Sequence, residues 1–276
     1  MKKALFFSIV SATMLLTASC GNVKDFVFVQ ISDTQVGFMD RSEHFTESDS
    51  LLKDAVDAIN RIKPSCVILT GDLTNDFKNE EQWAIYNKRM GEISPKIPVY
   101  ITPGNHDIPE FNDETLAAYI DRIGYDRFSF VQNKCAFIGF DSCRIKSDDS
   151  AAEQEQFEWL KGELEKAQGS RHIFVFFHCP IVYHTLDEEM NTNSFPVELR
   201  QKYLSLFLDS NVDAVFTGHT HNGVTIDLNG LKSVNVGPVA KAFGKGGSGL
   251  NVVKVTKDGF ESSFCPGKEI LENWTD

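Results

Sequence analysis

The stretch IPVYITPGNHD (residues 97–107) decides the fold class of this 276-residue chain. In it, an apolar run typical of a buried strand ends in a polar motif that contains Asn105, His106 and Asp107. Four more apolar runs end in the same way, and the motifs that follow them are SDTQ (32–35), GDLTND (71–76), FFHCP (176–180) and GHTH (218–221). In α/β proteins, ligands bind in the crevice beyond the carboxyl ends of the strands. We therefore expect these polar residues to meet at one edge of a sheet.

The segments between the apolar runs predict helices. In residues 48–63, apolar side chains recur at helical spacing until Pro64 ends the pattern. Four further helices are expected at 80–91, 113–123, 151–167 and 195–210. This alternation of strands and helices predicts an α/β fold with a largely parallel central sheet and helices outside it.

The pattern then changes toward β-structure. A hairpin is expected around residues 132–134, and from Gly223 onward short strand-like runs are separated by Asn-Gly, Gly-Gly and Asp-Gly turns. These C-terminal runs are suited to supply a second sheet. No linker or internal repeat divides the chain, so we expect a single domain over residues 26–270.

The N-terminus has the pattern of a targeting segment. Lys2 and Lys3 precede an apolar stretch, 4–16, and small residues then lead to Cys20. This pattern resembles the cleavage box of bacterial lipoproteins, in which the cysteine becomes the lipidated first residue, although Thr17 departs from the usual leucine. We expect residues 1–20 to be a signal peptide and the protein to be an exported lipoprotein, anchored to a membrane in the periplasm or at the cell surface. Ordinary secretion, with Cys20 as a bystander, is the alternative.

Charge and cysteine content narrow the range of partners. The net charge of −12 at pH 7 argues against a nucleic-acid surface, because phosphate backbones favour clustered Lys and Arg. Five cysteines remain after Cys20, at irregular spacings and without a CxxC pair. They indicate neither a disulfide framework nor a zinc ribbon, although one disulfide is compatible with export.

The motifs combine the residue types of a metal-dependent hydrolase. Carboxylate, amide and imidazole groups from several strand ends form a site of mixed oxygen and nitrogen ligands. Two divalent ions roughly 3.5–4 Å apart would supply what the hydrolysis of a phosphate ester needs: a bridging water acidic enough to act as hydroxide, and neutralisation of the phosphoryl charge. Asp72 is the natural bridge, because the preceding Gly71 leaves room for a tight turn. The expected ligands are Asp33, Asp72, Asn105, His178, His219 and His221.

Two further features refine this hypothesis. Residues two apart in an extended segment point to the same side, so His219 and His221 are expected to serve neighbouring metals. His106 follows Asn105 and would face the substrate as a general acid, with Asp107 orienting it or favouring its protonated form. A role for His106 as an orienting donor to the phosphate is the alternative.

In this order, the motifs resemble those of the calcineurin-like metallophosphoesterase superfamily: D-x-H, G-D, G-N-H-[DE], a lone His and G-H-x-H. The resemblance covers about residues 26–255. It implies a four-layer α/β/β/α sandwich, in which two mixed sheets are flanked by helices. It also implies a dinuclear metal centre whose two ions share Asp72, one with Asp33 and His221 and the other with Asn105, His178 and His219.

One position departs from the family pattern, because Gln35 stands where a histidine is usual. A similar D-x-Q start, preceded by a dipeptide like Val29-Gln30, resembles the branch of calcineurin-like phosphoesterase domain-containing Ser/Thr phosphatases. The amide oxygen of Gln35 is either a weak ligand or a hydrogen-bond partner of a ligand. We expect two divalent ions among Mn, Fe, Zn and Mg, with Mn favoured, and a first site that prefers hard ions or is partly occupied.

Two functions are compatible with these residues. The first is an exported phosphohydrolase that cleaves phosphomonoesters or phosphodiesters. The second is a catalytically weak or inactive lipoprotein that binds metal or a phosphate-bearing ligand, with Gln35 as the mark of lost activity. Retention of Asp72, Asn105 and His106 favours the enzyme.

Selectivity for the substrate is expected to lie in the loops 40–47 and 183–194. In the second loop, His184 either overhangs the mouth of the site or is an ordinary loop residue. The acidic run 187–189 is expected to be solvated.

Overall fold

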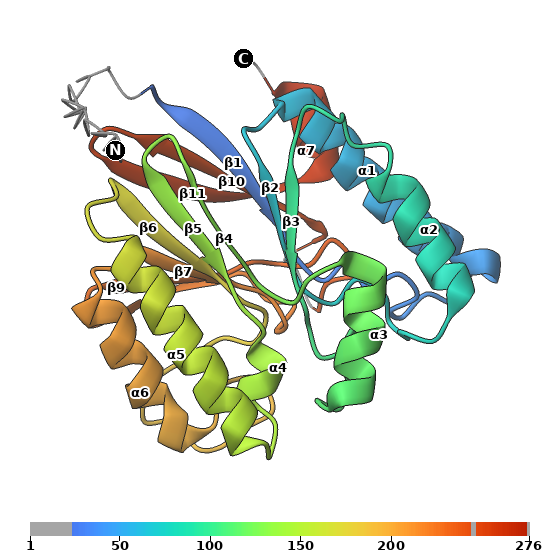
Figure 1. Cartoon of the computed structure of the whole chain (residues 1–276). Coiled ribbons are helices and arrows are strands. Elements are labelled where there is room, and N and C mark those ends of the chain that lie inside the picture. Colours follow the sequence, from blue (N-terminus) through green and yellow to red (C-terminus); the bar gives the residue numbers. More distant parts are fainter. Residues whose placement is uncertain (1–23, 244–246, 275–276) are drawn as a thin grey trace, which may run out of the picture.

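The computed structural model describes residues 24–243 and 247–274, and the predicted signal peptide with Cys20 lies outside them. In the described part, two mixed sheets face each other and helices cover the outer face of each (Figure 1). This is the four-layer arrangement that the resemblance implies, and the prediction of its fold class is confirmed.

The first sheet has the strand order β11-β10-β1-β2-β3. Its three parallel strands carry the first three motifs at their carboxyl ends: β1 (Phe26–Ile31), β2 (Val67–Thr70) and β3 (Val99–Thr102). An antiparallel hairpin of β10 (Gly249–Thr256) and β11 (Gly259–Pro266) extends the sheet beyond β1.

The second sheet has the order β4-β5-β6-β7-β9-β8. Its parallel strands are β5 (Cys135–Gly139), β6 (His172–Phe176), β7 (Ala214–Thr217) and β9 (Leu231–Asn235). The strands β4 (Phe128–Gln132) and β8 (Val224–Leu228) pair antiparallel at the two edges. The FFHCP and GHTH motifs follow β6 and β7.

All five predicted helices are present, with ends within two residues of those expected. They are α1 (Thr46–Ile62), α2 (Glu80–Met90), α3 (Asp113–Ile123), α5 (Ser150–Lys166) and α6 (Val197–Asp209). Three short helical segments were not expected: η1 (Glu43–Phe45), α4 (Ser142–Ile145) and α7 (Gly267–Asn273). Figure 1 shows α1, α2 and α7 on the side of the first sheet and α5 and α6 on the side of the second.

The space between the two sheets is filled mainly by aromatic side chains. The Phe28 ring of β1 lies 5.2–5.9 Å, between ring centroids, from four phenylalanines of the second sheet: Phe137, Phe174, Phe176 and Phe216. Burial of rings of this size is a large hydrophobic contribution, and edge-to-face contacts add to it. The inter-sheet core therefore fixes how the carboxyl ends of the two parallel sets lie opposite each other.

The expectation that the C-terminal runs supply a second sheet is only half right. Strands β8 and β9 join the second sheet, while β10 and β11 join the first. The reason is visible in β10, where Leu250 and Val252 pack under the helices and Val253 and Val255 pack between the sheets. A strand that is apolar on both faces needs an interior position beside β1.

The described residues include no helix with the length and apolar character that crossing a membrane requires. The five cysteines after Cys20 are free thiols within this part of the chain. Cys66, Cys135 and Cys179 are buried, as their apolar surroundings predict.

Candidate metal centre

The strand-end motifs of both sheets meet at one edge of the sandwich, as predicted. Asp72, His178 and His219 each place a ligand atom within 4.8 Å of the others. Asn105 joins this group, because its amide oxygen lies 3.1 Å from His178 Nε2. These four residues follow β2, β6, β7 and β3, so both sheets contribute to the cluster.

Asp72 occupies the centre of the cluster and is almost fully buried. One of its carboxylate oxygens, Oδ1, accepts a hydrogen bond of 2.8 Å from the backbone N–H of His106, and the other lies 3.2 Å from His178 Nε2. The turn that presents Asp72 needs Gly71, which has φ +82 and has no room for a Cβ beside Gly104 and His178. Asp72 therefore faces both sheets from the end of β2.

Asp33 and His221 lie together in a second group beside the first. Both oxygens of Asp33 accept from the backbone N–H of His219, at 3.2 and 3.0 Å, and Oδ1 lies 3.4 Å from His221 Nε2. A Cβ on Gly218 would lie 2.5 Å from Asp33 Oδ2 and 1.8 Å from Ser32 Oγ, so only glycine fits there. The GHTH turn thus packs directly on the D-x-Q turn.

Backbone carbonyl groups orient the three histidines that are candidate ligands. His178 places Nδ1 2.7 Å from the Thr70 carbonyl oxygen, and His221 places Nδ1 3.3 Å from that of Lys241. His219 instead places Nε2 3.0 Å from the Thr192 carbonyl oxygen. A carbonyl oxygen only accepts, so each of these nitrogens carries a proton, and the other ring nitrogen is the one left to bind a metal ion in place of a proton. This second hydrogen bond is typical of metal-binding histidines.

The two histidines of GHTH reach the site for a different reason from the one expected. The segment is not extended, since His219 and His221 both have left-handed backbone angles, with φ of 73 and 55. Asn235 of β9 holds this turn by accepting from Thr220 Oγ1 at 2.6 Å and donating to Thr217 Oγ1 at 3.0 Å. The turn sends His219 toward Asp72 and His221 toward Asp33.

The expectation for Asp107 is also wrong, because its carboxylate does not contact His106. It accepts instead from the backbone N–H groups of Gly104, Asp72 and Leu73, at 2.8, 2.8 and 2.9 Å. Asp107 therefore connects the GNHD turn to the GD turn. A carboxylate suits this position because its two oxygens together accept from three backbone N–H groups.

His106 is oriented by Asn75, which the sequence did not single out as an orienting residue. The Nδ1 atom of His106 lies 2.7 Å from the Asn75 carbonyl oxygen and donates to it. The Nε2 atom is the ring nitrogen that this bond leaves free. His106 is half-buried, whereas Asp72, which accepts from its backbone N–H, is buried. His106 is therefore the more solvent-accessible of the two neighbours.

Gln35 is a buried residue whose side-chain oxygen lacks a protein partner. It is 1% exposed, and Oε1 accepts no hydrogen bond from any residue of the described chain. Its backbone N–H donates to the Asp72 carbonyl oxygen at 2.8 Å, which fixes the turn at φ 29. A buried amide oxygen without a donor is costly unless a cation or a water satisfies it. The D-x-Q turn therefore fits a cation.

The pKa shifts of the clustered residues also indicate a site for divalent cations. Burial favours a neutral imidazole, yet the adjoining Asp72 raises the pKa of His178 to about 9, and His178 in turn holds the pKa of Asp72 below its usual range despite burial. Burial and the charge of His178 lower the pKa of His219 to about 4. Burial and the Asp72 carboxylate raise the pKa of Asp107 to about 8. Several carboxylates crowded in a buried site are the environment that divalent cations neutralise.

The loop 183–194 is anchored by Glu188, contrary to the expectation that the run 187–189 is merely solvated. The Glu188 carboxylate accepts from the backbone N–H groups of Tyr183 and His184, both at 2.7 Å, and from Ser194 Oγ at 2.9 Å. These bonds lower the pKa of Glu188 to about 2 against the effect of burial. The His184 side chain is exposed in this loop.

Arg200 of α6 supports the loop from below. It is 2% exposed and donates to the Phe195 carbonyl oxygen and to Ser194 Oγ, each at 3.1 Å. The Arg200 and Glu188 bonds fix the end of the loop, and so the position of the Thr192 carbonyl group that orients His219. Sequence reasoning missed this part of the site, because a buried arginine in a helix has no local motif.

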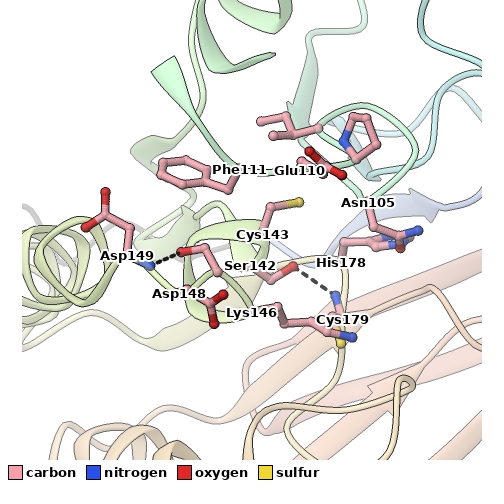
Figure 2. A pocket seen from close by; sticks show the side chains of 13 residues that line it. Asn105, Glu110, Phe111, Ser142, Cys143, Lys146, Asp148, Asp149, His178 and Cys179 are labelled. Atoms are coloured by element: carbon pink, nitrogen blue, oxygen red, sulfur yellow. Dashed lines mark hydrogen bonds between the residues drawn. The ribbon is translucent and has the colours of Figure 1, made fainter. Parts of the chain in front are cut away.

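A cavity of about 720 Å³ opens beside Asn105 and His178 (Figure 2). One wall follows the GNHD motif and is largely apolar; it contains Ile108, Pro109, Glu110 and Phe111. The other wall is formed by α4 and the residues after it, and contains Lys146, Asp148 and Asp149. A cavity of this size accommodates a small organic group next to the candidate ligands.

The fold and this donor set match those of metal-dependent phosphohydrolases. The chain belongs to the calcineurin-like phosphoesterase family, whose model matches residues 26–223. The serine/threonine-protein phosphatase CPPED1 of Danio rerio is 29% identical to it over 259 residues, which are 84% of this chain and 82% of that protein. This similarity agrees with the expected D-x-Q branch.

Solved structures agree with the fold. A dimetal phosphatase from Danio rerio superposes with a TM-score of 0.67 at 16% identity, covering 88% of this chain and 96% of that one. GAP50, the anchor in the inner membrane complex of Plasmodium, superposes with a TM-score of 0.62 at 16% identity, covering 89% of this chain and 85% of that one. At such identities the likeness concerns the fold alone, so the choice among functions depends on the site residues.

Proposed function

We propose that this protein is an exported phosphohydrolase that uses two divalent cations to cleave phosphate esters. The observation that carries the proposal is the orientation of the three histidines. Each gives one ring N–H to a backbone carbonyl oxygen and keeps the other nitrogen for the cluster of Asp72, Asn105 and Asp33. A hydrogen bond of this kind on the second ring nitrogen is typical of metal-binding histidines and supports metal binding at this cluster.

The residues divide into two sets around a shared carboxylate. Asp72 would serve both ions, one set being Asp33, Gln35 and His221 and the other Asn105, His178 and His219. Two cations held in this way make water a stronger nucleophile and neutralise charge on the phosphoryl oxygens. Four of these residues offer carboxyl or amide oxygens, which suit hard ions such as Mn²⁺, and three offer imidazole nitrogens, which also suit Zn²⁺ and Fe²⁺.

His106 is the proposed general acid. Its Nδ1 atom is held by the Asn75 carbonyl oxygen, and its backbone N–H is held by Asp72, so the ring has a fixed orientation next to Asp72. A protonated Nε2 in this position gives its proton to the leaving alcohol oxygen as the P–O bond breaks.

Turnover of simple esters tests the proposal. We expect the mature protein with Mn²⁺ to hydrolyse p-nitrophenyl phosphate or its bis ester, and an Asp72→Asn variant to lose at least about a thousandfold in kcat/KM. Equal rates in the two proteins would contradict the proposal. Absence of turnover on both esters and on a broad panel of phosphate compounds would favour the binding lipoprotein instead.

Gln35 provides a second test, directed at metal preference. An amide oxygen favours hard ions over Zn²⁺, so we propose that Mn²⁺ or Mg²⁺ occupies the site of Asp33 and His221. A Gln35→His variant should then bind Zn²⁺ at least tenfold more tightly, measured by competition with a chromophoric chelator. Tight zinc at both sites of the unaltered protein would contradict this choice of metal.

We propose further that Cys20 anchors the exported protein to a membrane through lipid. Support comes from the sequence, in which small residues precede Cys20 after a basic and apolar leader. Cells that express the chain should incorporate labelled palmitate into it, and a Cys20→Ala variant should not. Label of equal intensity in the variant would refute lipidation at this residue.

A further inference from the structure

Lys146 brings a positive charge to the ligands of the second set. It follows α4, and in Figure 2 its side chain runs along the cavity toward Cys179, the residue after His178. Its ammonium group donates to the Thr192 carbonyl oxygen, which is also the oxygen that orients His219. A single carbonyl group therefore separates the Lys146 ammonium from a candidate metal ligand.

This charge is available to a ligand. Within the described residues, no carboxylate lies within the 4.0 Å ion-pair distance of the Lys146 ammonium. The neighbouring Arg144, by contrast, pairs with Asp126 at 2.8 Å and with Glu155 at 3.1 Å. Lys146 is also the one lysine or arginine in the described lining of the cavity.

A neutral carbonyl group is a weaker partner for an ammonium than a phosphate oxygen, because hydrogen bonds between two charged groups are roughly twice as strong. The loop 183–194 does not depend on the Lys146 bond, since Glu188 and Arg200 hold it independently. Exchange of the Thr192 oxygen for a substrate oxygen therefore leaves the loop in place.

We infer that Lys146 is a specificity-determining residue that binds a terminal oxygen of the substrate phosphate and makes the site prefer phosphomonoesters to phosphodiesters. A monoester carries two negative charges and three terminal oxygens at neutral pH. A diester carries one charge and two terminal oxygens, and its second ester group occupies the position of the third oxygen. The Lys146 ammonium thus gains a full charge-assisted bond with the monoester alone.

The inference rests on the proposed hydrolysis, and a charge-changing variant tests it on two substrates. The Lys146→Gln variant keeps an N–H donor for Thr192 but removes the charge, Lys146→Arg keeps the charge, and Lys161→Gln removes an exposed charge of α5 as the control. With p-nitrophenyl phosphate and Mn²⁺, Lys146→Gln should lose roughly 10–100-fold in kcat/KM, mainly through KM. With the bis ester the loss should stay below about threefold, and Lys146→Arg should retain most activity on both.

Equal losses on the two esters, or no loss on either, would overturn the inference while leaving the proposed hydrolysis intact. A measurement without turnover separates the two proposals further. Inorganic phosphate, titrated calorimetrically into the Mn²⁺-loaded protein, should bind at least tenfold more weakly to Lys146→Gln than to Lys161→Gln. Equal affinities would refute the role of Lys146 even if neither ester were hydrolysed.

Discussion

Replacement of Asp72 by asparagine should destabilise the protein by an amount that depends strongly on pH when a chelator keeps metal ions away. Asp72 raises the pKa of the buried His178 from its ordinary 6.5 to about 9. At about 1.4 kcal/mol per pKa unit, this rise corresponds to about 3.5 kcal/mol. The lowered pKa of Asp72 reflects the same interaction with His178.

The sign follows from linkage. A histidine whose pKa is higher in the folded state contributes its full stabilisation below about pH 6.5, and that stabilisation is lost as the pH rises through about 9. Burial and the Asp72 carboxylate raise the pKa of Asp107 to about 8, so removal of Asp72 also relieves a repulsion at high pH. Both effects make the loss of folding stability in Asp72→Asn largest in weakly acidic solution.

Thermal unfolding in EDTA, followed by circular dichroism, measures this difference. At about pH 6, Asp72→Asn should lower Tm by roughly 7–14 °C, because 1 kcal/mol shifts Tm by about 2–4 °C in a domain of this size. At about pH 9.5 the loss should fall below a third of that value. Asp187→Asn, a change in an exposed loop carboxylate, is the control and should leave Tm unchanged at both pH values. An equal loss for Asp72→Asn at both pH values would refute the coupling.

Three further outcomes follow from the site. His106→Gln should lower kcat by about 10²–10³-fold for an alkyl phosphate but much less for p-nitrophenyl phosphate, whose leaving group needs no proton; equal losses would assign His106 to positioning. Gly218→Ala places a Cβ 2.5 Å from Asp33 Oδ2 and should weaken Mn²⁺ binding at least tenfold by equilibrium dialysis, whereas Gly162→Ala, whose Cβ meets nothing within 4 Å, should not. Asp148 in the cavity wall repels anionic groups, so Asp148→Asn should raise kcat/KM about twofold to fivefold for phosphate esters with an anionic leaving group. If kcat/KM for these esters, relative to esters with a neutral leaving group, did not change, Asp148 would lie away from the bound substrate.

The strand-end part of the site could be predicted because it depends on local rules. An apolar run followed by a short polar motif indicates the carboxyl end of a strand, and parallel strands bring these ends to one edge. Asp33, Asp72 and His178 needed nothing more to be placed together. The family resemblance then supplied what local rules do not, which is the division of the chain into two facing sheets.

Errors arose where the backbone does not follow a regular period. His219 and His221 were expected on an extended segment, but a turn with left-handed angles presents them. Asp107 was expected to act on its neighbour His106, but its carboxylate satisfies three backbone N–H groups from two turns. Spacing along the chain does not reveal which buried N–H group needs an acceptor, because that depends on how the turns pack.

The groups proposed to select a substrate lie outside the metal-binding motifs, so relatives with the same motifs can differ in substrate. Thr192 and Asn75 act through carbonyl oxygens, which leave no trace in residue identity, and Lys146 reaches the site from the segment after α4. A protein can therefore keep every predicted ligand and still change its substrate through one lysine or one loop anchor such as Glu188. Substrate preference in this family should follow the residues at positions equivalent to Lys146 and the anchoring of the loop 183–194 more closely than it follows the metal-binding motifs.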